Sequence, residues 1–201
     1  MSGTFSALVV CTGNICRSPL AEQLLRARFG AAGMSVIVRS AGTSALEGSD
    51  MTDEAAALAR QYGGTGAGHI ARQLTSDLVA NADLVLTATR EHRHAVVALH
   101  PRAARYAYTL TQFARLVDAV DTATLDQSGS DGLSVLLDEV AATRGFAPPP
   151  VHPDLDDITD PYRRSQQVYE EAGRAIDAAV TTIVAGVTGV AGAAEARAGR
   201  A

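Results

Sequence analysis

A nine-residue segment near the start of the chain, Cys11–Pro19, carries residue types that could do chemistry on a phosphate. It consists of Cys-Thr-Gly-Asn-Ile-Cys-Arg-Ser-Pro and follows the apolar run Phe5–Val10. The pattern predicts a buried strand, a tight loop and a helix with Ser18 as N-cap and proline as its first residue. Such a helix N-terminus attracts an oxyanion and favours the thiolate form of Cys11, and Arg17 can bind two anion oxygens. These residues predict a covalent phosphatase site with a cysteine nucleophile.

The composition excludes several other kinds of protein. The chain has 201 residues, 47% of them hydrophobic, which is enough for one domain with a full core. Its net charge is −5 and it has no basic tract, so we expect no binding to nucleic acid. All 17 basic residues are arginines, which excludes lysine-dependent nucleotide loops and Schiff-base chemistry. The two cysteines make no disulfide scaffold, and the histidine spacing predicts no metal site or cofactor.

Two segments are informative about the cellular location of the protein. Met1–Val10 lacks the basic start and the cleavage site of a signal peptide. Val180–Val190 is apolar, but it is short and interrupted by Gly186 and Gly189, so it is not expected to span a bilayer. We therefore expect a cytoplasmic protein without membrane contact.

Short apolar runs alternate with helical patterns along the chain. The expected strands are Phe5–Val10, Val36–Arg39, Asp83–Ala88 and Arg105–Leu110. The expected helices are Pro19–Phe29, Asp53–Tyr62, Ser76–Ala80, Arg90–Leu99, Gln112–Val120, Leu133–Thr143 and Ser165 to about Val187. Threonines stand at four of the expected N-caps, namely Thr52, Thr75, Thr89 and Thr111. This alternation predicts a three-layer α/β fold, with a four-stranded parallel sheet flanked by helices and the phosphatase loop after the first strand.

The Cys11–Pro19 segment resembles the signature of the low-molecular-weight protein tyrosine phosphatases, and the resemblance covers Ser6 to about Leu99 and Asp157 to Val184. It implies hydrolysis of phosphotyrosine, or of another aryl phosphate monoester, through a cysteinyl-phosphate intermediate. The implied partners are a phosphotyrosine-containing protein or small aryl phosphate and a bacterial tyrosine kinase. The implied phosphate-binding residues are Thr12, Gly13, Asn14, Ile15, Cys16 and Ser18.

A proton donor to the leaving oxygen is also required. The late acidic loop offers four carboxylates, and the residues alone leave the choice open among Asp154, Asp156, Asp157 and Asp160. The resemblance selects Asp160, because the family carries its acid in an Asp-Pro pair followed by an aromatic residue, here Tyr162. It further implies a hydrogen-bond network of Ser40 and His69 with the loop asparagine, and a hydrogen bond from Ser18 to the Cys11 thiolate.

The sequence departs from the family pattern in four places. Ala88-Thr89 stands where the family has Met-Asp, Leu46 replaces an aromatic wall of the pocket, and Arg163 replaces a second aromatic residue after the Asp-Pro pair. The fourth departure is an insert at about residues 118–154, so we expect a bacterial member of the family with an insert. We expect a single domain over residues 1–188 and a disordered tail over residues 189–201.

Alternative functions use the same loop. An arsenate reductase would need only Cys11 together with an external low-molecular-weight thiol, whereas the thioredoxin-linked kind needs two further cysteines and only Cys16 is present. A phosphate-binding scaffold is disfavoured because nucleophile, anion clamp and acid are all present. A reversible Cys11–Cys16 disulfide would protect the nucleophile from overoxidation.

Overall fold

Four short strands form the sheet at the centre of the computed structural model, which describes residues 4–121 and 132–198. Strand β1 (Ser6–Cys11) lies between β2 (Ile37–Gly42) and β3 (Leu84–Thr87), and β4 (Ala107–Thr109) extends the sheet beyond β3. Every pair is parallel, so the carboxyl ends of the strands meet at one edge. Cys11 is the last residue of β1 and therefore lies at this edge. The predicted α/β fold is confirmed.

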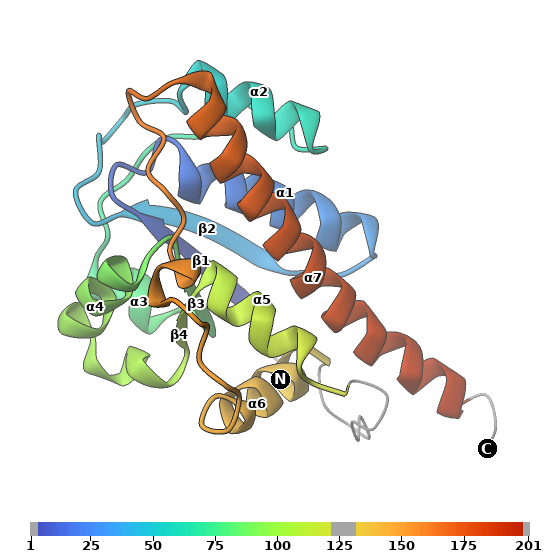
Figure 1. The fold of residues 1–201 in the computed structure, drawn as a ribbon. Coiled ribbons are helices and arrows are strands. Elements are labelled where there is room, and N and C mark those ends of the chain that lie inside the picture. Colours follow the sequence, from blue (N-terminus) through green and yellow to red (C-terminus); the bar gives the residue numbers. More distant parts are fainter. Residues whose placement is uncertain (1–3, 122–131, 199–201) are drawn as a thin grey trace.

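Helices cover both faces of the sheet, which gives three layers (Figure 1). Side chains alternate along β1, so Ala7 and Val9 enter one apolar core while Leu8 and Val10 enter the other. The larger core lies under α1 (Arg17–Ala31), α2 (Asp53–Gln61), α5 (Leu110–Asp118) and α7 (Gln166–Ala198). The smaller core lies under α3 (Ser76–Ala80) and α4 (Arg90–Leu99). Gly186 lets α7 approach α5 closely, because a Cβ there would overlap Val117.

Two helix starts differ from the prediction. Helix α1 begins at Arg17, two residues early, and its N-cap Cys16 makes no capping hydrogen bond through its side chain. Ser18 and Pro19 thus lie in the first turn, where backbone N–H groups have no intrahelical partner and proline costs nothing. Helix α5 begins at Leu110, with Thr109 rather than Thr111 as the capping residue, because Leu110 belongs to the buried face of the helix. The other three threonines cap as predicted, at Thr52, Thr75 and Thr89.

The expected insert contributes helix α6 (Gly132–Thr143), and its residues 122–131 lie outside the described part of the chain. The apolar residues Leu133, Leu136 and Val140 of α6 are buried in the larger core. The connection from α6 to α7 is irregular, as predicted, apart from the 3-10 helix Pro153–Asp156 (η3). A second 3-10 helix, Pro101–Arg105 (η1), precedes β4 and shortens the predicted fourth strand.

Helix α7 extends into the stretch over which a disordered tail was expected. Helix α7 continues through the Ala-rich sequence to Ala198, and alanine has the highest intrinsic helix propensity. Residues 199–201 of the expected tail lie outside the described part of the chain. Within the described ranges, no helix is both long enough and apolar enough to cross a membrane.

Candidate active site

The loop after β1 is held by its carbonyl groups. The carbonyl oxygens of Cys11, Thr12, Gly13 and Ile15 accept from backbone N–H groups of the neighbouring segment 43–52 at 2.9 to 3.0 Å. The fifth carbonyl, that of Asn14, accepts from Nε2 of His69 at 2.6 Å. Because the peptide bonds of this loop are trans, the N–H groups of the same peptides point to the opposite, inner side of the loop. Asn14 has φ 56°, a left-handed conformation that asparagine tolerates better than most residues.

The nucleophile candidate Cys11 is almost fully buried, and its Sγ lies 3.0 Å from Oγ of Ser18. The amide of Asn14 donates to the same Ser18 oxygen at 2.9 Å, so the Ser18 proton is directed to the sulfur. Cys16 lies in a different environment, 3.6 Å from the hydroxyls of Thr52 and Tyr169. Burial raises the pKa of the Cys16 thiol, although these hydroxyls oppose the shift. The thiol of Cys16 is therefore poorly suited to nucleophilic attack.

The expected network around Asn14 is present and includes one residue that the sequence analysis missed. Asn14 Nδ2 donates to Ser40 Oγ at 2.8 Å, and Ser40 in turn donates to the buried carboxylate of Glu22. The backbone N–H of Arg72 donates to Asn14 Oδ1 at 2.9 Å, which fixes the orientation of the amide. A carboxylate on the buried face of a predicted helix was the available signal for Glu22, since such a group needs partners.

Arg17 is buried and connects the loop to the acidic segment before α7. Its Nη1 donates to the carbonyl of Ile158 at 3.0 Å, and its Nη2 lies 2.6 Å from Oδ2 of Asp160. Among the described residues, Arg17 Nε has no hydrogen-bond partner despite its burial. An unpaired buried guanidinium N–H is costly, so its presence at the end of this loop indicates an anion site.

The structure distinguishes the four candidate acids. Asp154 and Asp157 both bind Arg90, and Asp156 binds Arg115. Burial disfavours the ionised form of Asp157, but hydrogen bonds from Arg90 outweigh it and lower its pKa. Asp160, in contrast, is about half exposed and directed at the loop through Arg17. Only Asp160 among the four contacts the phosphate loop.

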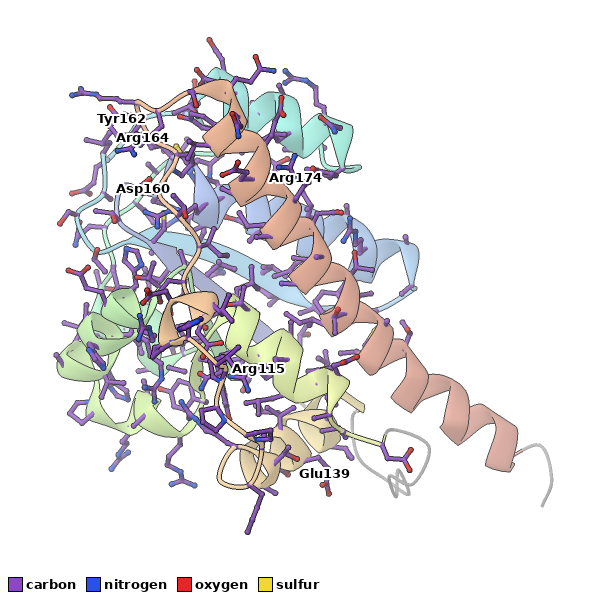
Figure 2. The ribbon with its side chains drawn as sticks, viewed as in Figure 1. Arg115, Glu139, Asp160, Tyr162, Arg164 and Arg174 are labelled. Atoms are coloured by element: carbon purple, nitrogen blue, oxygen red, sulfur yellow. The ribbon has the colours of Figure 1, made fainter. Side chains whose placement is uncertain are left out.

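A pocket of about 160 Å³ opens over the loop, and its floor includes Cys11 and Arg17. Its walls include the side chains of Ile15, Leu46 and Tyr162, with Asp160 at the rim. Asp160 and Tyr162 lie on the segment that leads into α7 (Figure 2). Arg163 has φ 59° and its guanidinium stacks on the Tyr162 ring, 5.0 Å from the ring centre. Arg163 stands where the family has a second aromatic residue, and its cation supports the Tyr162 ring in the pocket wall.

A buried histidine on α4 also reaches the loop, although the sequence analysis gave it no role. His92 Nε2 shares a hydrogen bond of 2.8 Å with Oγ1 of Thr12. It lines a second cleft of about 490 Å³ that continues from the loop on the side of Thr89 and Asp157. Only the packing of α4 on β3 brings this histidine to the loop, so its spacing in the sequence carried no signal.

Comparison with known proteins finds low molecular weight protein tyrosine phosphatases among the relatives of this chain. A family model described as low molecular weight phosphotyrosine protein phosphatase matches residues 6–129. The tyrosine phosphatase Etp of Escherichia coli K12 is 44% identical over 96 residues, which cover 48% of this chain and 62% of Etp. A low molecular weight protein-tyrosine-phosphatase of Streptomyces coelicolor is 31% identical over 189 residues, which cover 92% of this chain and 94% of that protein.

The solved structures agree. The YwlE arginine phosphatase from Geobacillus stearothermophilus is similar with a TM-score of 0.63 and 28% identity, over 90% of each chain. On the family match, the near full-length relative and the shared fold, this chain belongs to the low-molecular-weight phosphotyrosine protein phosphatase family.

Proposed function

We propose that this protein is a phosphatase that hydrolyses aryl phosphate monoesters, phosphotyrosine in proteins above all, through a phosphorylated Cys11. The observation that carries the proposal is the convergence of three groups on one pocket. Cys11 lines the pocket, Arg17 lines it too and has an unpaired Nε, and Asp160 reaches the same guanidinium from the rim. Nucleophile, anion clamp and proton donor are the three groups that the reaction needs.

In the first step, the inward N–H groups of the loop and Arg17 bind the phosphoryl oxygens. A phosphate dianion competes with Asp160 for the guanidinium, and the two adjacent negative charges favour a proton shared between them. The Cys11 thiolate, which accepts a hydrogen bond from Ser18, attacks phosphorus. The S–P bond forms, the P–O bond to the aryl group breaks, and the leaving oxygen takes the proton from Asp160.

In the second step, water hydrolyses the cysteinyl phosphate. Asp160, now ionised, accepts a proton from the attacking water, and the S–P bond breaks to release phosphate and the Cys11 thiolate. The hydrogen bond from Ser18 stabilises this sulfur as a leaving group. Arg17 spans both steps because its planar fork matches the equatorial oxygens of the transferring group.

The pocket walls support an aryl substrate. Ile15, Leu46 and Tyr162 offer apolar contact to a ring, whereas the side chain of phosphoarginine would carry guanidinium N–H groups into the same space. Donors that face apolar walls lose their hydrogen bonds to water without replacement. A protein phosphotyrosine made by a tyrosine kinase fits this chemistry best.

The test compares four reactions under one set of conditions. We expect turnover of p-nitrophenyl phosphate and of a phosphotyrosine peptide, with much slower release of phosphate from a phosphoarginine peptide. Mass spectrometry of acid-quenched enzyme should find one phosphoryl group on Cys11. Arsenate with a low-molecular-weight thiol should give no sustained thiol oxidation. Thiol-dependent arsenate turnover without phosphate release from aryl esters would overturn the proposal in favour of the reductase.

A further inference from the structure

His92 joins helix α4 to the phosphate loop through two threonine hydroxyls. Its side chain is buried, with Nδ1 2.7 Å from Oγ1 of Thr89 and Nε2 2.8 Å from Oγ1 of Thr12. Thr89 stands where the family pattern has a carboxylate. The imidazole therefore has a partner on each ring nitrogen, which fixes its orientation.

The contact at Thr12 reaches two parts of the proposed chemistry. Thr12 directly follows the nucleophile, and its carbonyl is held by the N–H of Ser44 at 3.0 Å. Its hydroxyl accepts a long hydrogen bond, 3.5 Å, from Nη2 of Arg17. His92 thus limits the rotation of the Thr12 side chain, which contacts both His92 and the guanidinium of Arg17.

The ring is suited to this task because it is neutral. Burial, aided by the positive charge of Arg17, lowers the pKa of His92 to about 4, against the weaker opposing effect of Asp160 and Asp157. A neutral imidazole has one N–H donor and one acceptor nitrogen, so it can serve both hydroxyls without adding a charge that would compete for the substrate phosphate.

The contacts do not serve the helix cap. Thr89 already caps α4 by accepting from the backbone N–H of His92 at 3.3 Å, and this bond needs no imidazole. The ring bonds to Thr89 and Thr12 are additional to the cap. Their combined effect is to tie the loop to the first turn of α4.

We propose that His92 is a positioning residue, which holds Thr12 and through it Arg17 in the orientation that binds the transferring phosphoryl group. The effect on rate rests on the proposed function, whereas the effect on anion binding does not. The prediction is a selective loss of affinity for a transition-state-like anion, with smaller loss for the ground-state anion.

The experiment compares two variants of His92 with a matched control on the same helix. His92→Phe keeps an aromatic ring of similar size but removes both hydrogen bonds, while His92→Gln can still reach Thr12. His94→Phe changes an exposed histidine two residues away and serves as the control. The measurements are melting temperature, dissociation constants for vanadate and inorganic phosphate, and kcat and KM for p-nitrophenyl phosphate.

We expect His92→Phe to weaken vanadate binding and lower kcat by about tenfold each, the size of one lost hydrogen bond. Phosphate binding and KM should change less, His92→Gln should recover part of both losses, and His94→Phe should match wild type. In a Thr12→Val background, which lacks the hydroxyl, His92→Phe should have little further effect.

Wild-type vanadate affinity and kcat in a folded His92→Phe protein would overturn the inference. If His92→Phe does not fold, His92→Gln and Thr12→Val test the inference instead. Vanadate affinities equal to that of wild type in both variants would reject it. A wild-type protein that turns over no aryl phosphate contradicts the proposed function alone, since the vanadate measurements still test His92.

Discussion

The phosphate loop and helix α6 of the insert are held in place by different forces. In the loop, five consecutive carbonyls each accept a hydrogen bond from a neighbouring segment, and the Asn14 side chain is bound by Ser18, Ser40 and the backbone of Arg72. Helix α6 is held by burial of an apolar face that includes Leu136. Hydrogen bonds fix direction and apolar burial does not, so changes near the loop should alter rate while changes in α6 should alter stability.

Arginines connect the insert to the rest of the molecule. Arg144, just after α6, donates to the carbonyls of Ala104 and Ala107 and stacks over the ring of Tyr108 at 4.3 Å. Arg115 of α5, which is labelled in Figure 2, donates to the carbonyl of Pro148 and pairs with Asp156. The segment that leads to Asp160 is thus anchored at a second place, away from the loop.

The largest effect is expected at the nucleophile. Cys11→Ser should bind vanadate or phosphate but lose more than about 10³-fold in kcat, because a serine hydroxyl in this loop has no adjacent base to ionise it. Cys16→Ser provides the matched control and should retain most of the activity, in keeping with the buried, high-pKa thiol. Residual turnover above a thousandth of wild type would point to another nucleophile.

The next effect tests the proton donor. Asp160→Asn should slow hydrolysis of esters with poor leaving groups by roughly 10²–10⁴-fold, and activated aryl esters much less. The basic limb of the pH–rate profile should flatten in the same variant. Asp154→Asn, which removes only an exposed partner of Arg90, should leave that limb in place. Equal slowing of all leaving groups with the limb unchanged would place the acid elsewhere.

Arg17→Lys tests whether the guanidinium does more than carry charge. The lysine ammonium keeps the charge but loses the planar fork, so kcat should fall by at least ~10²-fold. The control is Arg26→Lys, because Arg26 lies on the same helix and pairs with Glu22 from an exposed position. A near-normal kcat in Arg17→Lys would assign Arg17 to loop structure alone.

Changes in α6 should alter stability and leave the catalytic rate unchanged, the opposite of changes near the loop. Leu136→Ala removes a fully buried side chain and should lower the free energy of unfolding by about 2–5 kcal/mol without changing kcat of the folded enzyme. Leu155→Ala, at an exposed leucine of η3, should change stability by less than about 0.5 kcal/mol. Urea unfolding together with p-nitrophenyl phosphate kinetics measures both. A large loss of kcat in Leu136→Ala would remove the distinction between the two regions.

The last prediction concerns stability in acid. The pKa of His92 is about 4 in the folded protein and about 6.5 in the unfolded chain, so the unfolded state binds more protons between these values. The free energy of unfolding should therefore fall as the pH is lowered from 6.5 towards 4, by up to about 3 kcal/mol. His92→Gln should flatten this dependence in urea titrations at a series of pH values. If the free energy of unfolding varied with pH in the same way in wild type and His92→Gln, the low pKa of His92 in the folded protein would be contradicted.

Several features could be predicted from local sequence because local physics decides them. The apolar run before Cys11 specifies a buried strand, Asn14 tolerates the left-handed loop, and Thr52 and Thr89 cap the helices that follow them. The loop signature also identified the family and led to the proposed phosphatase chemistry. The residues alone left four carboxylates open, and only the resemblance to the family selected Asp160, which the structure brings to Arg17.

Other features could not be predicted because they depend on contacts between residues far apart in the chain. Glu22 meets Ser40, and His92 meets Thr12, only once α1 and α4 have packed on the sheet. The start of α5 at Leu110 and the extension of α7 to Ala198 also differ from the sequence pattern. The sequence by itself determined the strand, the loop and the reactive groups, since these follow from residue type and spacing. Tertiary structure alone decided which buried partners orient those groups, because burial and hydrogen bonding between distant segments exist only in the folded chain.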